Sequence, residues 1–168
     1  MFNSHEEMVA KLAKPGDEIL AGLNEQKWSL ICSSIQEAVA VGDYLDVVKK
    51  HVIYGKDMGL DSLRYPIPVP AGLTPEKCHL LHMAIGIFGE AAEFLSCIFS
   101  HCLGGELDTE NAIEELGDLD FYEEGARQEL RISLQQVLSH NMAKLSARYS
   151  TGSYSNQQAQ ERADKAEA

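Results

Sequence analysis

GEAAEFL (residues 89–95) and IEELGDLDF (residues 113–121) each place a pair of acidic residues three positions apart. In an α-helix, residues at this spacing lie on the same face. The pairs are Glu90 with Glu93, and Glu115 with Asp118. Between the two stretches lies a Gly-Gly pair at residues 104–105, where one helix can end and the chain can turn. We therefore expect two antiparallel helices whose acidic side chains converge.

The converging carboxylates predict a metal site. Four neighbouring carboxylates repel one another unless a cation lies between them, and small or apolar residues surround both pairs. An oxygen-only ligand set without histidine favours a hard ion, Mg²⁺ or Mn²⁺, over zinc. We expect Glu90, Glu93, Glu115 and Asp118 to be the ligands. Glu114 lies about 100° away around its helix and is expected either just behind the ligands or at the surface.

The rest of the chain predicts an all-α fold in a single domain, residues 1–168. Ser4 is expected to cap a helix that Pro15 and Gly16 stop, and Asn24 to open a second helix. The alternating prolines in residues 58–73 indicate an extended connector. Later helices are expected from Thr74-Pro75 to about residue 103, from Asp108 or Thr109 to about residue 128, and over residues 130–149. A polar tail, residues 150–168, follows.

An internal repeat is a further expectation. A shift of 50 residues superposes AGLNEQKWSLICSSI (21–35) on AGLTPEKCHLLHMAI (71–85) without a gap. Chance similarity of two amphipathic helices is the alternative. In the first copy, residues 21–57, Ala40 and Asp43 stand where the catalytic helices, residues 71–149, have Glu90 and Glu93. The first copy should therefore pack against the second copy without forming its own metal centre.

Composition excludes several classes of function. The net charge of −12 argues against binding a nucleic-acid polymer, which needs a basic face. We find no signal-peptide pattern and no continuous apolar run of membrane-spanning length, so no membrane partner is expected. The four cysteines lie in apolar helical stretches, which favours a reduced, cytoplasmic setting.

Three stretches together resemble the MazG-like, all-α nucleoside triphosphate pyrophosphohydrolases: GEAAEFL, ENAIEELGDLDF and HNMAKLSARYSTGSYSNQQAQERADK. The similarity is greatest to the short, single-domain form found in phage genomes, and it covers residues 71–165 well. The signature of the family, E-x-x-E followed by E-x-x-D, falls on the four acidic residues named above. Gly89 departs from the family, which often has Glu at that position.

The resemblance implies a helical bundle that binds Mg²⁺, with Mn²⁺ as a substitute, through Glu90, Glu93, Glu115 and Asp118. It implies hydrolysis of a nucleoside or deoxynucleoside triphosphate to the monophosphate and pyrophosphate, in control of the nucleotide pool. It also implies a homodimer or a higher homo-oligomer. Two alternatives remain open: a catalytically silent helical assembly protein, and a pyrophosphohydrolase of another substrate such as phosphoribosyl-ATP.

Candidate substrate-binding residues follow on the last long helix. Asn141, Lys144 and Arg148 share one helical face, with Tyr149 beside them, and a Lys and an Arg suit a triphosphate. A basic last turn that complements the helix dipole is the alternative. Tyr122, one turn beyond Asp118, is expected near the substrate or a group behind the ligands. The KKHVIYGK stretch at 49–56 either contacts the triphosphate or forms a solvated basic helix end.

Overall fold

The computed structural model describes residues 2–60 and 68–165, and all regular structure within these ranges is helical. The all-α prediction is therefore confirmed. The chain divides into two compact units. A central unit, residues 26–131, holds most of α3 (Glu25–Val52), α4 (Pro75–Cys102) and α5 (Thr109–Leu130). A terminal unit, residues 1–25 and 132–168, holds α1 (His5–Leu12), α2 (Gly16–Ala21), α6 (Leu134–Arg148), α7 (Asn156–Glu161) and a 3₁₀ turn, η1 (Ala163–Lys165).

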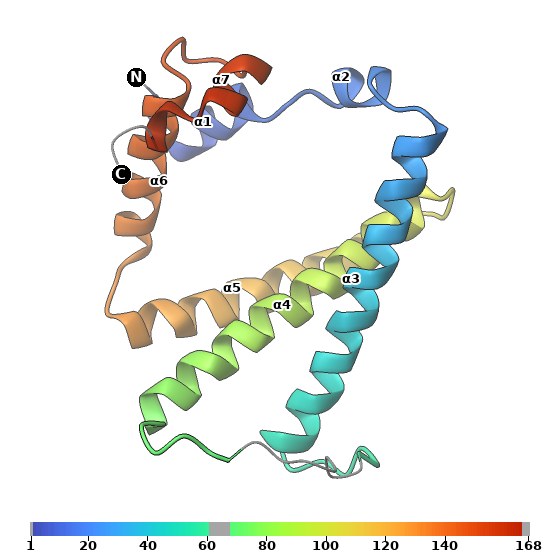
Figure 1. The fold of residues 1–168 in the computed structure, drawn as a ribbon, viewed down its shortest axis with the longest axis vertical. Coiled ribbons are helices and arrows are strands. Elements are labelled where there is room, and N and C mark those ends of the chain that lie inside the picture. The colour runs from blue at the N-terminus through green and yellow to red at the C-terminus, as the bar shows by residue number, and fades with distance from the viewer. Residues whose placement is uncertain (1, 61–67, 166–168) are drawn as a thin grey trace. The chain divides into compact units, whose positions relative to one another are not determined.

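Helices α4 and α5 form the expected antiparallel hairpin (Figure 1). Thr74 caps α4 by accepting a hydrogen bond from the backbone N–H of Lys77, with Pro75 in the first turn. Asp108 caps α5 in the same way through the N–H of Asn111, at 3.0 Å. Between them Gly104 adopts φ 101°, a left-handed conformation that glycine accepts without strain. Both predicted helix starts are confirmed.

Glycines bring the helices of the central unit close together. A Cβ at Gly86 of α4 would overlap the ring of Tyr122 on α5, and a Cβ at Gly125 would overlap the sulfur of Met83. Helix α3 crosses this hairpin, as Figure 1 shows, and Gly42 lies against Ala92 at the crossing. These contacts hold the acidic face of α4 next to both α3 and α5.

The two helices of the expected repeat have matching lengths. Helices α3 and α4 each contain 28 residues, and their first residues, Glu25 and Pro75, are 50 positions apart. Gly42 and Ala92, which touch at the crossing, are also equivalent positions of the repeat. The two helices touch at this crossing, and the pseudo-symmetric packing expected from the repeat stays a prediction. Common origin of the two copies stays a prediction.

The connector predicted over residues 58–73 lies partly outside the described residues. Residues 55–60 and 68–70, which border the gap, have no regular structure, and a turn at residues 71–72 leads into α4. The extended conformation expected for residues 61–67 therefore lies outside the described residues.

The terminal unit has a small hydrophobic core. Phe2, Met8, Leu12 and Tyr149 are buried together, and Met142 and Leu145 of α6 pack against them. Ser4 caps α1 as expected, through the N–H of Glu7 at 3.1 Å. The tail forms α7 and η1. Arg148, the last residue of α6, donates two hydrogen bonds to Asp164 of η1, at 2.6 and 2.8 Å.

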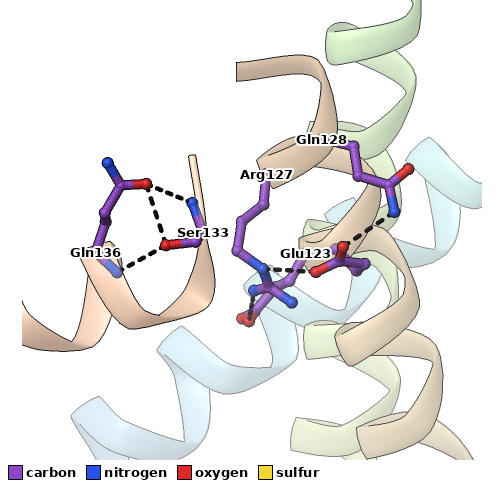
Figure 2. A network of polar contacts seen from close by, with 6 residues as sticks. Glu123, Arg127, Gln128, Ser133 and Gln136 are labelled. Carbon is purple, nitrogen blue, oxygen red and sulfur yellow. Dashed lines mark hydrogen bonds and ion pairs between the residues drawn. The ribbon is translucent and has the colours of Figure 1, made fainter. Parts of the chain in front are cut away.

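The prediction of a helix from residue 130 was wrong at its start. Helix α5 continues to Leu130 and ends at Arg131, which adopts the left-handed φ of 57°. Helix α6 then begins at Leu134, where Ser133 and Gln136 form a capping box (Figure 2). Figure 2 also shows Arg127 of α5 paired with Glu123, one turn earlier. The sequence S-L-Q-Q contained the capping signal that marks the observed start.

One described helix, α4, is long and apolar enough to cross a membrane by length and composition alone. Its most apolar 18-residue window has a mean hydropathy of 1.4, and 28% of that window is buried. A core helix of a soluble protein can pass the same test, so this property is weak evidence for a membrane span. The expectation of no membrane partner stays a prediction.

Candidate metal centre

Three of the predicted ligands lie together in the central unit. Glu90 and Glu93 project from α4 and Glu115 from α5, and each offers a carboxylate oxygen within 4.8 Å of the others. Glu90 and Glu115 are each only 7% exposed, and Glu93 is half-buried. Among the described residues, Glu115 has no hydrogen-bond or ion-pair partner. Three carboxylates that converge without a cation repel one another, so this oxygen-only set fits a hard divalent cation.

Asp118, the fourth predicted ligand, lies outside this group of three. Its side chain is exposed, one turn along α5 from Glu115. Asp118 is still near enough for its charge to raise the pKa of Glu115. Its role as a ligand stays a prediction.

The charges in the cluster change the pKa of its members. Burial first, and then the charges of Glu93, Glu90 and Asp118, raise the pKa of Glu115 to about 7. Burial, followed by the charges of Glu90 and Asp46, also raises the pKa of Glu93. Both shifts indicate that the cluster disfavours full ionisation without a cation.

Lys49 of α3 supplies a positive charge at one side of the cluster. It is only 4% exposed, and its Nζ lies 3.2 Å from Oε1 of Glu90 and 3.2 Å from Oδ1 of Asp46. Burial lowers the pKa of Lys49, but hydrogen bonds to Asp46 and Glu90 outweigh this effect and raise it well above the usual value. Lys49 is therefore a permanent cation beside Glu90.

A chain of polar contacts lies behind Lys49. The Nζ is 3.4 Å from the hydroxyl oxygen of Tyr122 and 5.1 Å from the centre of its ring. The hydroxyl of Tyr122 is 3.2 Å from that of Tyr54, which in turn lies 3.0 Å from Nε2 of His82. Burial and the contact with Tyr54 raise the pKa of Tyr122 to about 12. Tyr122 thus supports Lys49, which agrees with a position behind the ligands.

Asp46 is a site residue that the sequence analysis missed. It is buried and pairs with both Lys49 and Lys50. Burial raises its pKa, yet the hydrogen bonds from Lys50 and Lys49 prevail and lower it. The sequence did contain a signal for these ion pairs. Asp46 precedes Lys49 by three positions and Lys50 by four, a spacing that brings side chains together on a helix. Only the packing of α3 on α4 makes this local ion pair part of the cluster.

A cavity of about 540 Å³ adjoins the cluster. Glu93 and Glu115 line it together with Asp43, Glu106, Asp108 and Asn111, and with two serines and Cys97. None of these described lining residues is Lys, Arg or His. The cavity is therefore strongly acidic and rich in hydrogen-bond acceptors.

Four of the predicted substrate-binding residues, Asn141, Lys144, Arg148 and Tyr149, belong to the terminal unit. Asn141 and Lys144 are half-buried and line a hollow of about 450 Å³ on α6. Arg148 is bonded to Asp164, and Tyr149 lies in the hydrophobic core. These contacts give Arg148 and Tyr149 structural roles within their unit. Their contact with a substrate stays a prediction.

We compared the chain with protein-family models, with curated proteins and with solved structures, and none of the three comparisons found a match. The class of protein is therefore described from the fold and the site alone, without a relative. It is an all-α protein in which two antiparallel helices carry a buried cluster of carboxylates able to hold a metal ion.

Proposed function

We propose that the protein is a Mg²⁺-dependent nucleoside triphosphate pyrophosphohydrolase. The observation that carries the proposal is the cluster of Glu90, Glu93 and Glu115, whose oxygens lie within 4.8 Å of one another. Such a set of carboxylates on facing helices suits the hard cations that accompany nucleoside triphosphates. The resemblance of the acidic stretches to the MazG-like enzymes supports the same activity. Mn²⁺ is the expected substitute ion.

The reaction requires water to attack phosphorus at the α–β junction. The water oxygen forms a bond to phosphorus, the bridging P–O bond breaks, and its electron pair leaves with the departing group. The products are the nucleoside monophosphate and pyrophosphate, and the proton lost by the attacking water passes to solvent. Mg²⁺ held at this site would neutralise phosphate charge and would make a water molecule a better nucleophile at neutral pH. Glu90, Glu93 and Glu115 would hold the ion, with Asp118 as the predicted fourth ligand.

The chain's own residues contribute position and charge. Lys49 fixes Oε1 of Glu90, which leaves the second carboxylate oxygen for the ion. Lys50 pairs with Asp46, the residue that also contacts Lys49. Glu115, whose pKa is raised to about 7 in the absence of an ion, would release its proton when a cation binds. These groups support a site that binds a triphosphate with its cation.

The test is product analysis with a panel of NTPs and dNTPs and Mg²⁺, scored for pyrophosphate against orthophosphate. Glu93→Gln should abolish pyrophosphate release and weaken Mn²⁺ binding measured by electron paramagnetic resonance. Glu110→Gln is the matched control, because Glu110 is an exposed residue of α5 outside the cluster. Orthophosphate as the primary product, or full activity of Glu93→Gln, would contradict the proposal.

We also propose that the protein acts as a homodimer or a higher homo-oligomer. Helix α5 exposes Ile113, Leu116 and Phe121, and α4 exposes Leu81 and Phe88. Exposed apolar residues of this size on paired helices favour association with further helices. Sedimentation of the full chain tests this, and a monomer at all concentrations would contradict it.

A further inference from the structure

A chain of hydrogen bonds joins the three helices of the central unit. Nζ of Lys49, on α3, lies 3.4 Å from the hydroxyl oxygen of Tyr122 on α5. That oxygen is 3.2 Å from the hydroxyl oxygen of Tyr54, which follows the end of α3 and lies 3.0 Å from Nε2 of His82 on α4. The ring of His82 also packs edge-on against both tyrosine rings, with centres 5.5 and 5.8 Å away. The chain therefore begins at a charged amine and ends at one ring nitrogen of His82.

Lys49 fixes the direction of these hydrogen bonds. An ammonium group has three donors and no acceptor, and the other contacts of this Nζ are with two carboxylates. Tyr122 must therefore accept from Lys49, and its own hydroxyl hydrogen can donate to Tyr54. The hydroxyl of Tyr54 can in turn donate to His82 only if Nε2 carries no hydrogen.

The chain is complete only when His82 is neutral and has its hydrogen on Nδ1. With the hydrogen on Nε2 instead, the oxygen of Tyr54 would accept from both neighbours, and its own hydrogen would have no acceptor in the chain. A protonated ring has hydrogens on both nitrogens, so it cannot accept from Tyr54 either. Protonation would also add a second positive charge near Lys49. Acid therefore removes the last hydrogen bond of the chain.

We propose that His82 is a pH switch that controls the attachment of Tyr54 to α4. The neutral ring accepts the hydrogen bond of Tyr54 and closes the chain. The ring is half-buried, so a proton from solvent can reach Nε2. Once this proton binds, Tyr54 loses its acceptor and the chain opens at α4. This role requires neither a metal ion nor a nucleotide, so it is independent of the proposed function.

The groups around His82 favour its neutral form. The titratable groups that act on it or contact it come from every helix of the central unit: Lys49 of α3, Tyr54 after α3, His79 of α4 and Tyr122 of α5. His79 is itself paired with Glu129 of α5. Burial, followed by the charges of Lys49 and His79, lowers the pKa of His82 below its ordinary 6.5. Neutral His82 therefore stabilises the fold above pH 6.5, and this contribution is lost as the pH falls through the lower pKa of the folded protein.

The test is an NMR titration of the isotope-labelled full chain, which observes His82 directly. Global unfolding would not isolate it, because Glu115 changes the stability with pH in the opposite direction. We expect an unprotonated Nε2 in mildly alkaline solution and a titration midpoint below 6.5. Tyr54→Phe removes the hydrogen that Nε2 accepts, so the midpoint should rise by roughly half to one pH unit, the effect of one hydrogen bond. Tyr44→Phe, the same substitution at an exposed tyrosine of α3 outside the chain, should leave the midpoint unchanged.

His82→Gln provides a second test, because glutamine can accept from Tyr54 and cannot be protonated. The ring signals of Tyr54 should follow the midpoint of His82 in the wild type and lose this pH dependence in the variant. PH dependence that persists in His82→Gln overturns the proposal, as does a hydrogen on Nε2 of the neutral ring or a midpoint at or above 6.5 in the wild type. An unchanged or lower midpoint in Tyr54→Phe also overturns it, because the hydroxyl of Tyr54 would then not donate to the ring.

Discussion

Nζ of Lys49 lies 3.2 Å from Oε1 of Glu90, although the two residues are 41 positions apart in the sequence. Both side chains are buried, and the contact joins α3 to the helix that carries two of the three clustered carboxylates. Lys49 therefore links the stability of the central unit to the geometry of the candidate site. The loss of one partner of a buried pair leaves the other charge without compensation.

The first prediction is that Lys49→Met destabilises the metal-free protein by about 3 kcal/mol, because Glu90 and Asp46 each lose a cation. A divalent ion replaces part of the missing charge, so Mg²⁺ or Mn²⁺ should restore stability more in the variant than in the wild type. Urea unfolding with and without the ion measures both effects. Lys56→Met, at an exposed lysine in the same stretch, should change neither. Equal ion-induced stabilisation of Lys49→Met and the wild type would contradict the role of Lys49.

The second prediction concerns the pH dependence of stability. Glu115 has a pKa of about 7 in the folded protein, whereas its ordinary value is 4.5. The folded state therefore binds the proton of Glu115 more tightly than the unfolded state does. Raising the pH from 4.5 to 7 therefore lowers the free energy of unfolding, by an amount that solvent screening keeps below about 3 kcal/mol from this group. Glu115→Gln removes this contribution, so the variant should gain stability over the wild type across the same pH range, without metal.

Chemical denaturation at several pH values measures that difference. Glu110→Gln, an exposed neighbour on α5, should follow the wild-type pH dependence. A saturating divalent ion should remove the advantage of Glu115→Gln, because the ion stabilises the ionised carboxylate. A constant difference between Glu115→Gln and the wild type from pH 4.5 to 7 would show that Glu115 titrates normally.

The sequence predicted those parts of the fold that depend on local signals. Thr74-Pro75 and Asp108 were identified as helix starts because their side chains cap backbone N–H groups within three residues. The pairing of Glu90 and Glu93 with Glu115 followed from spacing on two helices joined by a short turn. These features need no knowledge of distant contacts.

Other features depend on tertiary packing and could not be predicted in this way. In the sequence, Asp46 and Lys49 have the spacing of an ordinary ion pair on a helix surface. They reach the cluster only because Gly42, which has no side chain, lets α3 approach Ala92 of α4. Short helix α2, over residues 16–21, was missed because Pro15 and Gly16 read as a helix stop, although proline also precedes helix starts. The end of α5 was missed because Arg131 adopts a positive φ that is uncommon for arginine.

The third prediction tests the close packing of α4 on α5. Gly86→Ala places a methyl group where the Tyr122 ring lies, so it should destabilise the protein by about 1–3 kcal/mol despite the better helix propensity of alanine. Displacement of Tyr122 also removes support from Lys49, so affinity for Mn²⁺ should fall. Gly117→Ala is the control, because a Cβ there meets no atom within 4 Å, and it should stabilise α5 by up to about 1 kcal/mol. Equal stability of the two variants would contradict the close contact of Gly86 with Tyr122.

The fourth prediction separates structural from substrate-binding roles on α6. Arg148 donates two hydrogen bonds to Asp164, whose side chain is only 2% exposed, so Arg148→Ala and Asp164→Asn should both lower Tm. Lys144 has no ion-pair partner among the described residues, and Lys144→Ala should leave Tm unchanged. If Lys144 binds the triphosphate, its removal should raise KM by roughly tenfold, the effect of one charge-assisted hydrogen bond.

Thermal unfolding and steady-state kinetics on the same samples distinguish the two roles. A rise in KM for Arg148→Ala that Asp164→Asn does not reproduce would show that Arg148 contacts the substrate in addition to its ion pair. Equal effects of the two variants on KM would assign Arg148 to the stability of the terminal unit alone. An unchanged KM for Lys144→Ala, with pyrophosphate still released, would remove Lys144 from the predicted substrate-binding residues.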